Sequence, residues 1–253
     1  MRFASLGSGS RGNATLIQSE DTILMVDCGF SASETETRLR RMGVEPGAIA
    51  SILVTHEHSD HASGVMRFAL RHRIPVRCTA GTRQACLERG FEAAEPIGGQ
   101  GKFVIGDIEV TPVTVPHDAR EPVQFLFDGG AHRFGLLTDV GSLTPHIRKM
   151  FSGCAALLLE CNHDREMLEN GPYPAALKER VGGPLGHLSN TQAADLVRSL
   201  DTQWLQHLVA AHLSEQNNTP ALARAALAGA LDCEPEWVGV ATQETGLGWL
   251  ELT

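Results

Sequence analysis

Four side chains that can bind metal ions lie within six residues of each other. They are His56, His58, Asp60 and His61, and they directly follow the apolar run at residues 51–54. Imidazole and carboxylate groups together suit Zn²⁺ or a neighbouring first-row metal such as Mn²⁺ or Fe. One tetrahedral ion with an open position would need fewer ligands from a single loop, so the segment predicts two metal ions. Such ions indicate hydrolytic chemistry, because metal-bound water loses its proton near pH ~7. A His-rich surface loop that binds nothing is the alternative, and the pattern disfavours it.

Three more candidate ligands each follow another apolar run. They are His117, Asp139 and His212. Sheet-based sites form at the carboxyl ends of strands, and a buried Asp in such a position needs a partner. Taken singly, Asp139 fits a turn equally well, and His117 and His212 each fit a helix cap. Their recurrence favours ligands.

The remaining pattern predicts the elements that position these side chains. Short β-type runs fill the first third, and the second half alternates strands with helices. We expect strands at residues 3–6, 13–17, 22–26, 52–54, 103–115, 123–137, 155–159, 208–211, 237–240 and 246–250. We expect helices at residues 32–42, 65–73 and 82–89, within 164–180, and at 191–200 and 220–230. This order predicts an α/β protein, an αββα sandwich of two mixed sheets flanked by helices. No repeat or linker divides the chain, so we expect one domain over residues 1–253.

The composition limits the function classes. The 253 residues include 21 Lys and Arg against 30 Asp and Glu, with 42% hydrophobic residues, which is typical of a soluble globular protein. Six Cys without a C-x-x-C pair argue against a zinc ribbon, a redox motif or a disulfide scaffold, and favour a reduced, cytoplasmic protein. The apolar runs are far shorter than the ~18 residues of a membrane span. The first residues resemble a strand, not a signal peptide.

The net charge of −9 disfavours nucleic acid as a partner, but the charge distribution is less discouraging. Residues 62–87 contain no acid and a run of basic side chains, Arg67, Arg71, His72, Arg73, Arg77 and Arg83. A solvated helix face is the ordinary interpretation of such charges. A cationic patch that follows a nucleic-acid strand is the alternative.

The order of the candidate ligands resembles that of the metallo-β-lactamase-fold hydrolases. The matching residues are Asp27, His56-x-His58-x-Asp60-His61, His117, Asp139 and His212. The resemblance implies a first metal held by His56, His58 and His117. It implies a second metal held by Asp60, His61 and His212. Asp139 would bridge both ions. Asp27 would be the buried carboxylate that orders the ligand loop without touching metal; a strand-end turn is its alternative.

A finer resemblance is to the YycJ/WalJ branch of bacterial nucleases. The segments that carry it are residues 7–13, 160–164, 171–174, 186–190 and 212–220. The chain is also similar to the tRNA 3′-processing endonucleases, in which a Glu orients a His that protonates the leaving oxygen. This resemblance implies that His187 is the proton donor and that Glu160 orients it. A place at a helix N-terminus, ahead of Ser189, is the alternative for His187.

The implied chemistry suits a phosphodiester. Two metals roughly 3.5 to 4 Å apart can hold a hydroxide in line with phosphorus and stabilise both the attacking and the leaving oxygen. The leaving alkoxide needs an acid, and a His of pKa near ~6.5 beside a carboxylate is suitable. We therefore expect Asp60, Glu160 and His187 to be catalytic.

A glycine-rich segment, residues 7–13, lies in the first predicted hairpin. No helix follows it, so it is not a phosphate loop of the usual kind. Either Ser10, Arg11 and Asn13 line the mouth of the site and contact substrate, or the segment is a flexible turn.

These patterns together predict a binuclear metal-dependent phosphodiesterase acting on nucleic acid, with DNA exonuclease activity implied by the YycJ resemblance. Only 21 residues separate His117 from Asp139, too few for the long arm with which many tRNA-processing relatives hold tRNA. An RNA-processing nuclease is therefore an alternative that we disfavour. The acidic charge favours another, a small-molecule hydrolase acting on a lactam, thioester, lactone or cyclic phosphodiester. A metal-stabilised binding module predicts a degraded ligand set, whereas every expected position is filled.

Overall fold

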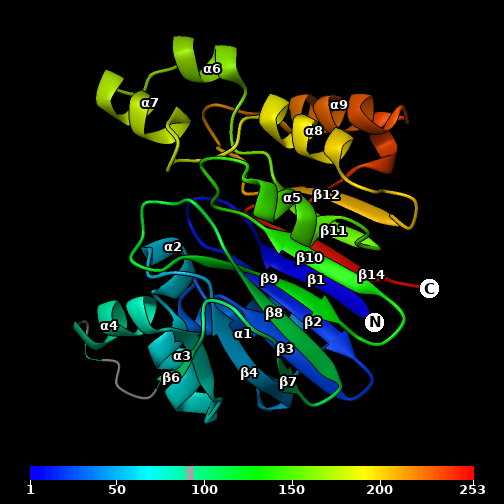
Figure 1. The fold of residues 1–253 in the computed structure, drawn as a ribbon. Coiled ribbons are helices and arrows are strands. Elements are labelled where there is room, and N and C mark those ends of the chain that lie inside the picture. The colour runs from blue at the N-terminus through cyan, green and yellow to red at the C-terminus, as the bar shows by residue number, and fades with distance from the viewer. Residues whose placement is uncertain (89, 91–93) are drawn as a thin grey trace.

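The computed structural model describes residues 1–88, 90 and 94–253, and within these it contains two facing β-sheets of seven strands each (Figure 1). The first sheet has the order β14-β1-β2-β3-β4-β5-β6. Its strands are β1 (Arg2–Gly7), β2 (Ala14–Ser19), β3 (Thr22–Val26), β4 (Ile49–Val54), β5 (Val76–Thr79), β6 (Ala94–Ile97) and β14 (Leu247–Glu251). Strands β1 to β3 are antiparallel neighbours, whereas β3 to β6 run parallel. The sheet is therefore mixed, as the sequence predicts.

The second sheet has the order β13-β12-β11-β10-β9-β8-β7. Its strands are β7 (Phe103–Ile105), β8 (Ile108–Thr114), β9 (Val123–Asp128), β10 (Arg133–Leu137), β11 (Ala156–Glu160), β12 (His207–Ala211) and β13 (Gly239–Val240). Strands β10 to β13 are parallel, and β7 to β10 are antiparallel hairpins. Strand β11 shows how the layers form: Leu157 and Leu159 face the helices, and Leu158 faces the other sheet.

Helices cover both outer faces, which confirms the αββα sandwich. On the first sheet lie α1 (Ala32–Arg41), α3 (Val65–His72) and α4 (Ala80–Glu88), and the short α2 (Ser59–Ala62) stands at the sheet's end. On the second lie α5 (Pro145–Phe151), α8 (Asn190–Ser199) and α9 (Pro220–Leu231). Between β11 and α8, α6 (Arg165–Asn170) and α7 (Ala175–Gly182) extend beyond the sheets (Figure 1). Single turns of 3-10 helix lie at Pro46–Ala48 and Pro235–Trp237.

Three apolar clusters hold these layers together. One lies between the sheets and includes Phe3, Phe125 and Phe134, and the rings of Phe3 and Phe134 stack with their centroids 4.3 Å apart. The other two lie between each sheet and its helices, around Phe68 in one case and Phe151 in the other. Within the described residues, no helix combines the length and the apolar character that a membrane crossing requires.

Most predicted elements are present, and four that the sequence did not indicate are added. Strands β5 and β6 have only four residues each, too few to show an alternation. Helix α5 begins at Pro145 and is capped by Thr144, whose hydroxyl accepts from the Ile147 N–H, and α2 is a single turn. The predicted helix at 82–89 begins earlier, at Ala80, and its last residue lies outside the described residues.

Candidate metal centre

The predicted ligands converge at the carboxyl ends of parallel strands from both sheets. Asp27 follows β3 and the 55–61 segment follows β4, whereas Asp139 and His212 follow β10 and β12. Asp27, Asp139 and His212 all have a positive φ, between 53° and 60°. A non-glycine residue pays roughly 1–3 kcal/mol for such a conformation, and such residues gather at functional sites.

The first predicted ligand group is assembled in the structure. His56, His58 and His117 each offer a ring nitrogen, and these atoms lie within 4.8 Å of one another. His117 Nε2 is 3.3 Å from His58 Nδ1. His56 is fully buried and His117 is 5% exposed. The segment after β4 thus meets a residue from the other sheet.

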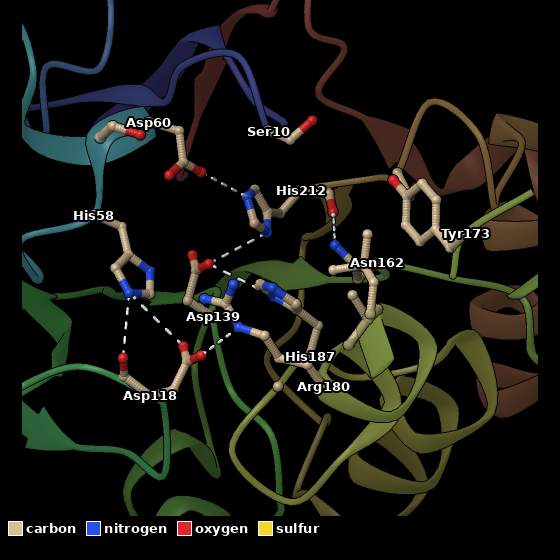
Figure 2. A pocket seen from close by; sticks show the side chains of 15 residues that line it. Ser10, His58, Asp60, Asp118, Asp139, Asn162, Tyr173, Arg180, His187 and His212 are labelled. Carbon is tan, nitrogen blue, oxygen red and sulfur yellow. Dashed lines mark hydrogen bonds and ion pairs between the residues drawn. The ribbon is translucent and has the colours of Figure 1, made fainter. Parts of the chain in front are cut away.

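The second predicted group is assembled beside the first. Asp60, His61 and His212 also have ligand atoms within 4.8 Å of one another. The Asp60 Oδ2 atom lies 3.3 Å from His61 Nε2 and 3.4 Å from His212 Nε2. Figure 2 shows Asp60 and His212 facing each other across the pocket.

Asp139 lies between the two groups. Its Oδ2 atom is 3.2 Å from His61 Nε2, and its Oδ1 atom is 3.9 Å from His117 Nε2. Among the described residues, Asp139 Oδ2 and His56 Nε2 are buried without a hydrogen-bond partner. Buried polar atoms without a partner are costly, and both point into a cluster of nitrogen and oxygen donors. The donor set and these two atoms fit divalent metal ions.

Each of the five histidines has its other ring nitrogen bonded outside the cluster. The partners are Thr55 Oγ1 for His56 (3.0 Å), the Asp118 carbonyl for His58 (3.2 Å), Asp27 for His61 (2.8 Å), the Gly186 carbonyl for His117 (3.1 Å) and Glu160 for His212 (3.1 Å). Metal-binding histidines are oriented in this way. Asp27 is 3% exposed and also accepts from Thr55, at the position expected of a loop-ordering carboxylate.

The electrostatics of the cluster match this geometry. Burial lowers the pKa of His212, but the Asp139, Asp60 and Glu160 carboxylates outweigh it and raise that pKa to about 10. Burial would raise the pKa of Asp139, but His212 and His61 hold it well below its usual range. Asp139 therefore stays ionised and His212 carries a proton, whereas burial lowers the pKa of His56 and His117. A metal ion would replace that proton, because ligands bind in their deprotonated form.

Glu160 and His187 are paired as the resemblance to the tRNA-processing enzymes implies. His187 Nδ1 donates to Glu160 Oε1 at 2.8 Å. The fully buried Glu160 carboxylate also accepts from the backbone N–H groups of Asp139, Val140 and Leu188. Burial lowers the pKa of His187, but Glu160 outweighs it, so the net shift is upward. The helix after His187 begins at its cap Ser189, so both interpretations of the segment fit its position.

The three glycine-rich-loop candidates lie in different surroundings. Ser10 lines the pocket. Arg11 forms ion pairs with Glu215, at 2.6 Å, and with Glu244. Asn13 is buried, and its side-chain amide lies 3.2 Å from His61 Nε2. Sequence reasoning did not foresee these partners of Arg11 and Asn13, because they come from distant segments.

The cluster lies at the bottom of a pocket of about 410 Å³ (Figure 2). Its wall contains polar residues for which the sequence analysis proposed no role, namely Asp118, Asn162, Tyr173, Arg180 and Ser214. Asp118 follows His117 directly, and Tyr173 is the only tyrosine of the chain. These two signals could have pointed to the pocket, whereas Arg180 looks like an ordinary helix residue.

Other basic residues have surroundings that the sequence does not reveal. His163 is 3% exposed, and its Nδ1 has no hydrogen-bond partner among the described residues. The basic run at 62–87 is also partly neutralised. Glu36 pairs with Arg71 and Glu95 with Arg77. Packing brings these acids from other elements, so the absence of acids within the run did not mean an unpaired patch.

Comparison with known proteins agrees with this architecture. The family profile described as "Beta-lactamase superfamily domain" matches residues 22–213. The chain therefore belongs to the β-lactamase superfamily. A solved structure of human tRNase Z, short form (ELAC1), has the same fold, with a TM-score of 0.69 and 17% identity over the whole of both chains.

Two curated proteins are similar over nearly their full length. "Exodeoxyribonuclease YycJ" of Bacillus anthracis is 33% identical over 95% of this chain and 93% of its own. "Exodeoxyribonuclease WalJ" of Streptococcus pneumoniae is 32% identical over 94% of this chain and 91% of its own. Within the superfamily, the chain belongs to the YycJ/WalJ branch.

Proposed function

We propose that this protein is a metal-dependent nuclease that removes nucleotides from the end of a DNA strand. The observation that carries the proposal is the union, in one pocket, of seven clustered ligand side chains with the Glu160–His187 pair. The names of its two full-length relatives support DNA as the substrate. We propose further that residues 1–253 form one domain, because β14 near the end of the chain pairs with β1 near its start.

The cluster would hold two divalent ions, Zn²⁺ or Mn²⁺, with Fe as a third candidate. His56, His58 and His117 would bind the first, and Asp60, His61 and His212 the second. Asp139 would contact both, since it lies between the groups. When bound, such ions activate water and stabilise negative charge on a phosphodiester.

His187 would protonate the leaving oxygen. Its Nδ1–H is held by Glu160, so Nε2 is the nitrogen left for the substrate. The side chain is 21% exposed and lines the pocket. Its raised pKa favours the protonated form, which a proton donor requires. Asp60, which is 19% exposed and also lines the pocket, would be catalytic as a ligand of the second metal ion.

The test is a time course with protein loaded with Zn²⁺ or Mn²⁺ and end-labelled single- and double-stranded DNA and RNA. Nitrocefin and a small phosphodiester serve as controls. We expect stepwise shortening of DNA from one end, abolished by Asp139→Ala. Turnover of the small molecules alone would refute the proposal and favour the small-molecule hydrolase. Shortening of RNA alone would favour an RNA-processing nuclease.

A further inference from the structure

The pocket wall contains one permanent positive charge. Among the pocket-lining residues of the described chain, Arg180 is the single Arg or Lys. Its side chain is 62% exposed, and its Nε donates to Asp118 Oδ2 at 2.7 Å. No other hydrogen bond of this guanidinium occurs within the described residues. The two terminal nitrogens are therefore free to bind an anion, while Asp118 holds the group in place.

An aromatic ring lies on the same segment. Tyr173 lines the pocket from the turn before α7, between Pro172 and Pro174. The two prolines restrict the backbone at this position. Its hydroxyl has no hydrogen bond, and its ring no aromatic or cationic partner, within the part of the chain that the structure describes. The described phenylalanines, by contrast, are buried in the core, except for the partly buried Phe103 in β7.

These two groups match the repeating chemistry of a nucleic-acid strand. Each nucleotide carries one negative phosphate and one flat base. A phosphate bound at the metal cluster would leave its neighbouring phosphate without a cation, and Arg180 is the one available in the pocket. Bases stack on aromatic side chains without regard to sequence. Figure 2 shows Tyr173 beyond Asn162 and His212, and Arg180 beside Asp118.

We propose that Tyr173 and Arg180 form a nucleotide clamp that determines the substrate of this site. Tyr173 stacks on the base next to the phosphate being cleaved, and Arg180 binds the neighbouring phosphate. Asp118, which also lines the pocket, holds the Arg180 guanidinium in place through its hydrogen bond to Nε. The inference rests on the proposed nuclease function and adds how a strand end is selected over a small phosphodiester.

The test pairs each substitution with a substrate that lacks the matching group. Tyr173→Leu removes the ring, and an abasic residue, moved along the first three positions of the strand, removes the base. Arg180→Gln removes the charge, and a neutral methylphosphonate linkage removes the phosphate charge. Arg198→Gln is the matched control, because Arg198 forms a similar helix-surface ion pair with Asp195 away from the pocket. KM is measured by steady-state kinetics of the otherwise wild-type protein. The Kd for DNA is measured by fluorescence anisotropy in a His187→Ala background.

Each clamp substitution is expected to raise KM and Kd about tenfold on ordinary DNA. Neither should raise them on the substrate lacking its partner, because the effects of interacting groups are not additive. Equal losses on ordinary and altered strands, or no loss at all, would overturn the clamp while wild-type cleavage of DNA continued. If the wild-type protein neither binds nor cleaves nucleic acid, the proposed function itself fails, and the clamp fails with it.

Discussion

The substitution Glu160→Gln tests how much of the site depends on one buried carboxylate. Glu160 Oε2 accepts from the N–H groups of Val140 and Leu188, at 3.1 and 2.9 Å. Its Oε1 accepts from Asp139 N–H and from Nδ1 of both His187 and His212, at 2.8 to 3.1 Å. A glutamine of nearly the same shape has one acceptor oxygen, so it cannot serve both sides.

The magnitude follows from the two ways of placing the amide. If its nitrogen faces Val140 and Leu188, two buried donors lose their acceptor at about 1–3 kcal/mol each, and the free energy of unfolding falls by about 2–6 kcal/mol. If the nitrogen faces the histidines, their Nδ1 atoms must become acceptors. The proton of His212 then moves to Nε2, the proposed metal-binding nitrogen, and metal affinity falls about 10- to 100-fold.

The assay measures both quantities on the same preparation. Urea unfolding of the metal-free protein, followed by circular dichroism, gives the free energy of unfolding. Competition with a chelating dye gives Zn²⁺ affinity. Turnover should fall in either case, because His187 loses its charged partner. Glu166→Gln, an exposed position on α6, is the control and should stay within about 0.5 kcal/mol of wild type. If Glu160→Gln changes stability by less than that and metal affinity by less than threefold, the reasoning is wrong.

Three further predictions concern other parts of the site. Asp139→Ala should lose bound metal and activity together, whereas His187→Ala should keep its metal and lose about 100-fold or more in kcat; metal analysis beside kinetics separates the two. Gly141→Ala should lower kcat with metal retained, because a Cβ there would lie 2.4 Å from the Pro184 carbonyl oxygen and 2.5 Å from Gly186 N, displacing the loop before His187. Burial lowers the pKa of His163 to about 4, below its unfolded value of 6.5. As pH falls below 6.5, the unfolded state takes up a proton that the folded state does not, so the free energy of unfolding falls. Between pH 7.5 and 5 the wild-type protein should therefore lose about 2 kcal/mol more of its free energy of unfolding than His163→Gln, as measured by urea unfolding.

Each of these has an outcome that contradicts it. Full phosphodiesterase activity in His187→Ala would remove this residue from the role of acid. Wild-type kcat in Gly141→Ala would mean that the 184–186 loop moves without disturbing His187. Parallel stability curves for wild type and His163→Gln would show that this buried ring does not titrate on unfolding.

Much of the fold follows from local patterns in the sequence. The buried strands β11 and β12 stand out as apolar runs, and α9 is a long apolar-faced segment capped by Thr219. The four-residue strands β5 and β6 show no such signal, since β5 forms on the parallel edge of β4, and β6 on the edge of β5. Pairing of this kind depends on a neighbour, not on the strand's own residues.

The ligand types and their order were determined by the sequence alone. The spacing of His56, His58, Asp60 and His61 places four donors in one loop, and the apolar runs before Asp139 and His212 predict strand ends. These are local properties, so neighbouring residues encode them. What the sequence could not decide was which distant groups would meet these donors.

Only the tertiary structure decided how the donors are held and what surrounds them. Glu160 supports His212 as well as His187, from strands that become neighbours only in the folded sheet. Arg180 reaches Asp118 across 62 positions of the chain. Contacts like these are selected by packing and by the burial of polar groups, which depend on the whole chain. Periodicity along a segment contains no information about them.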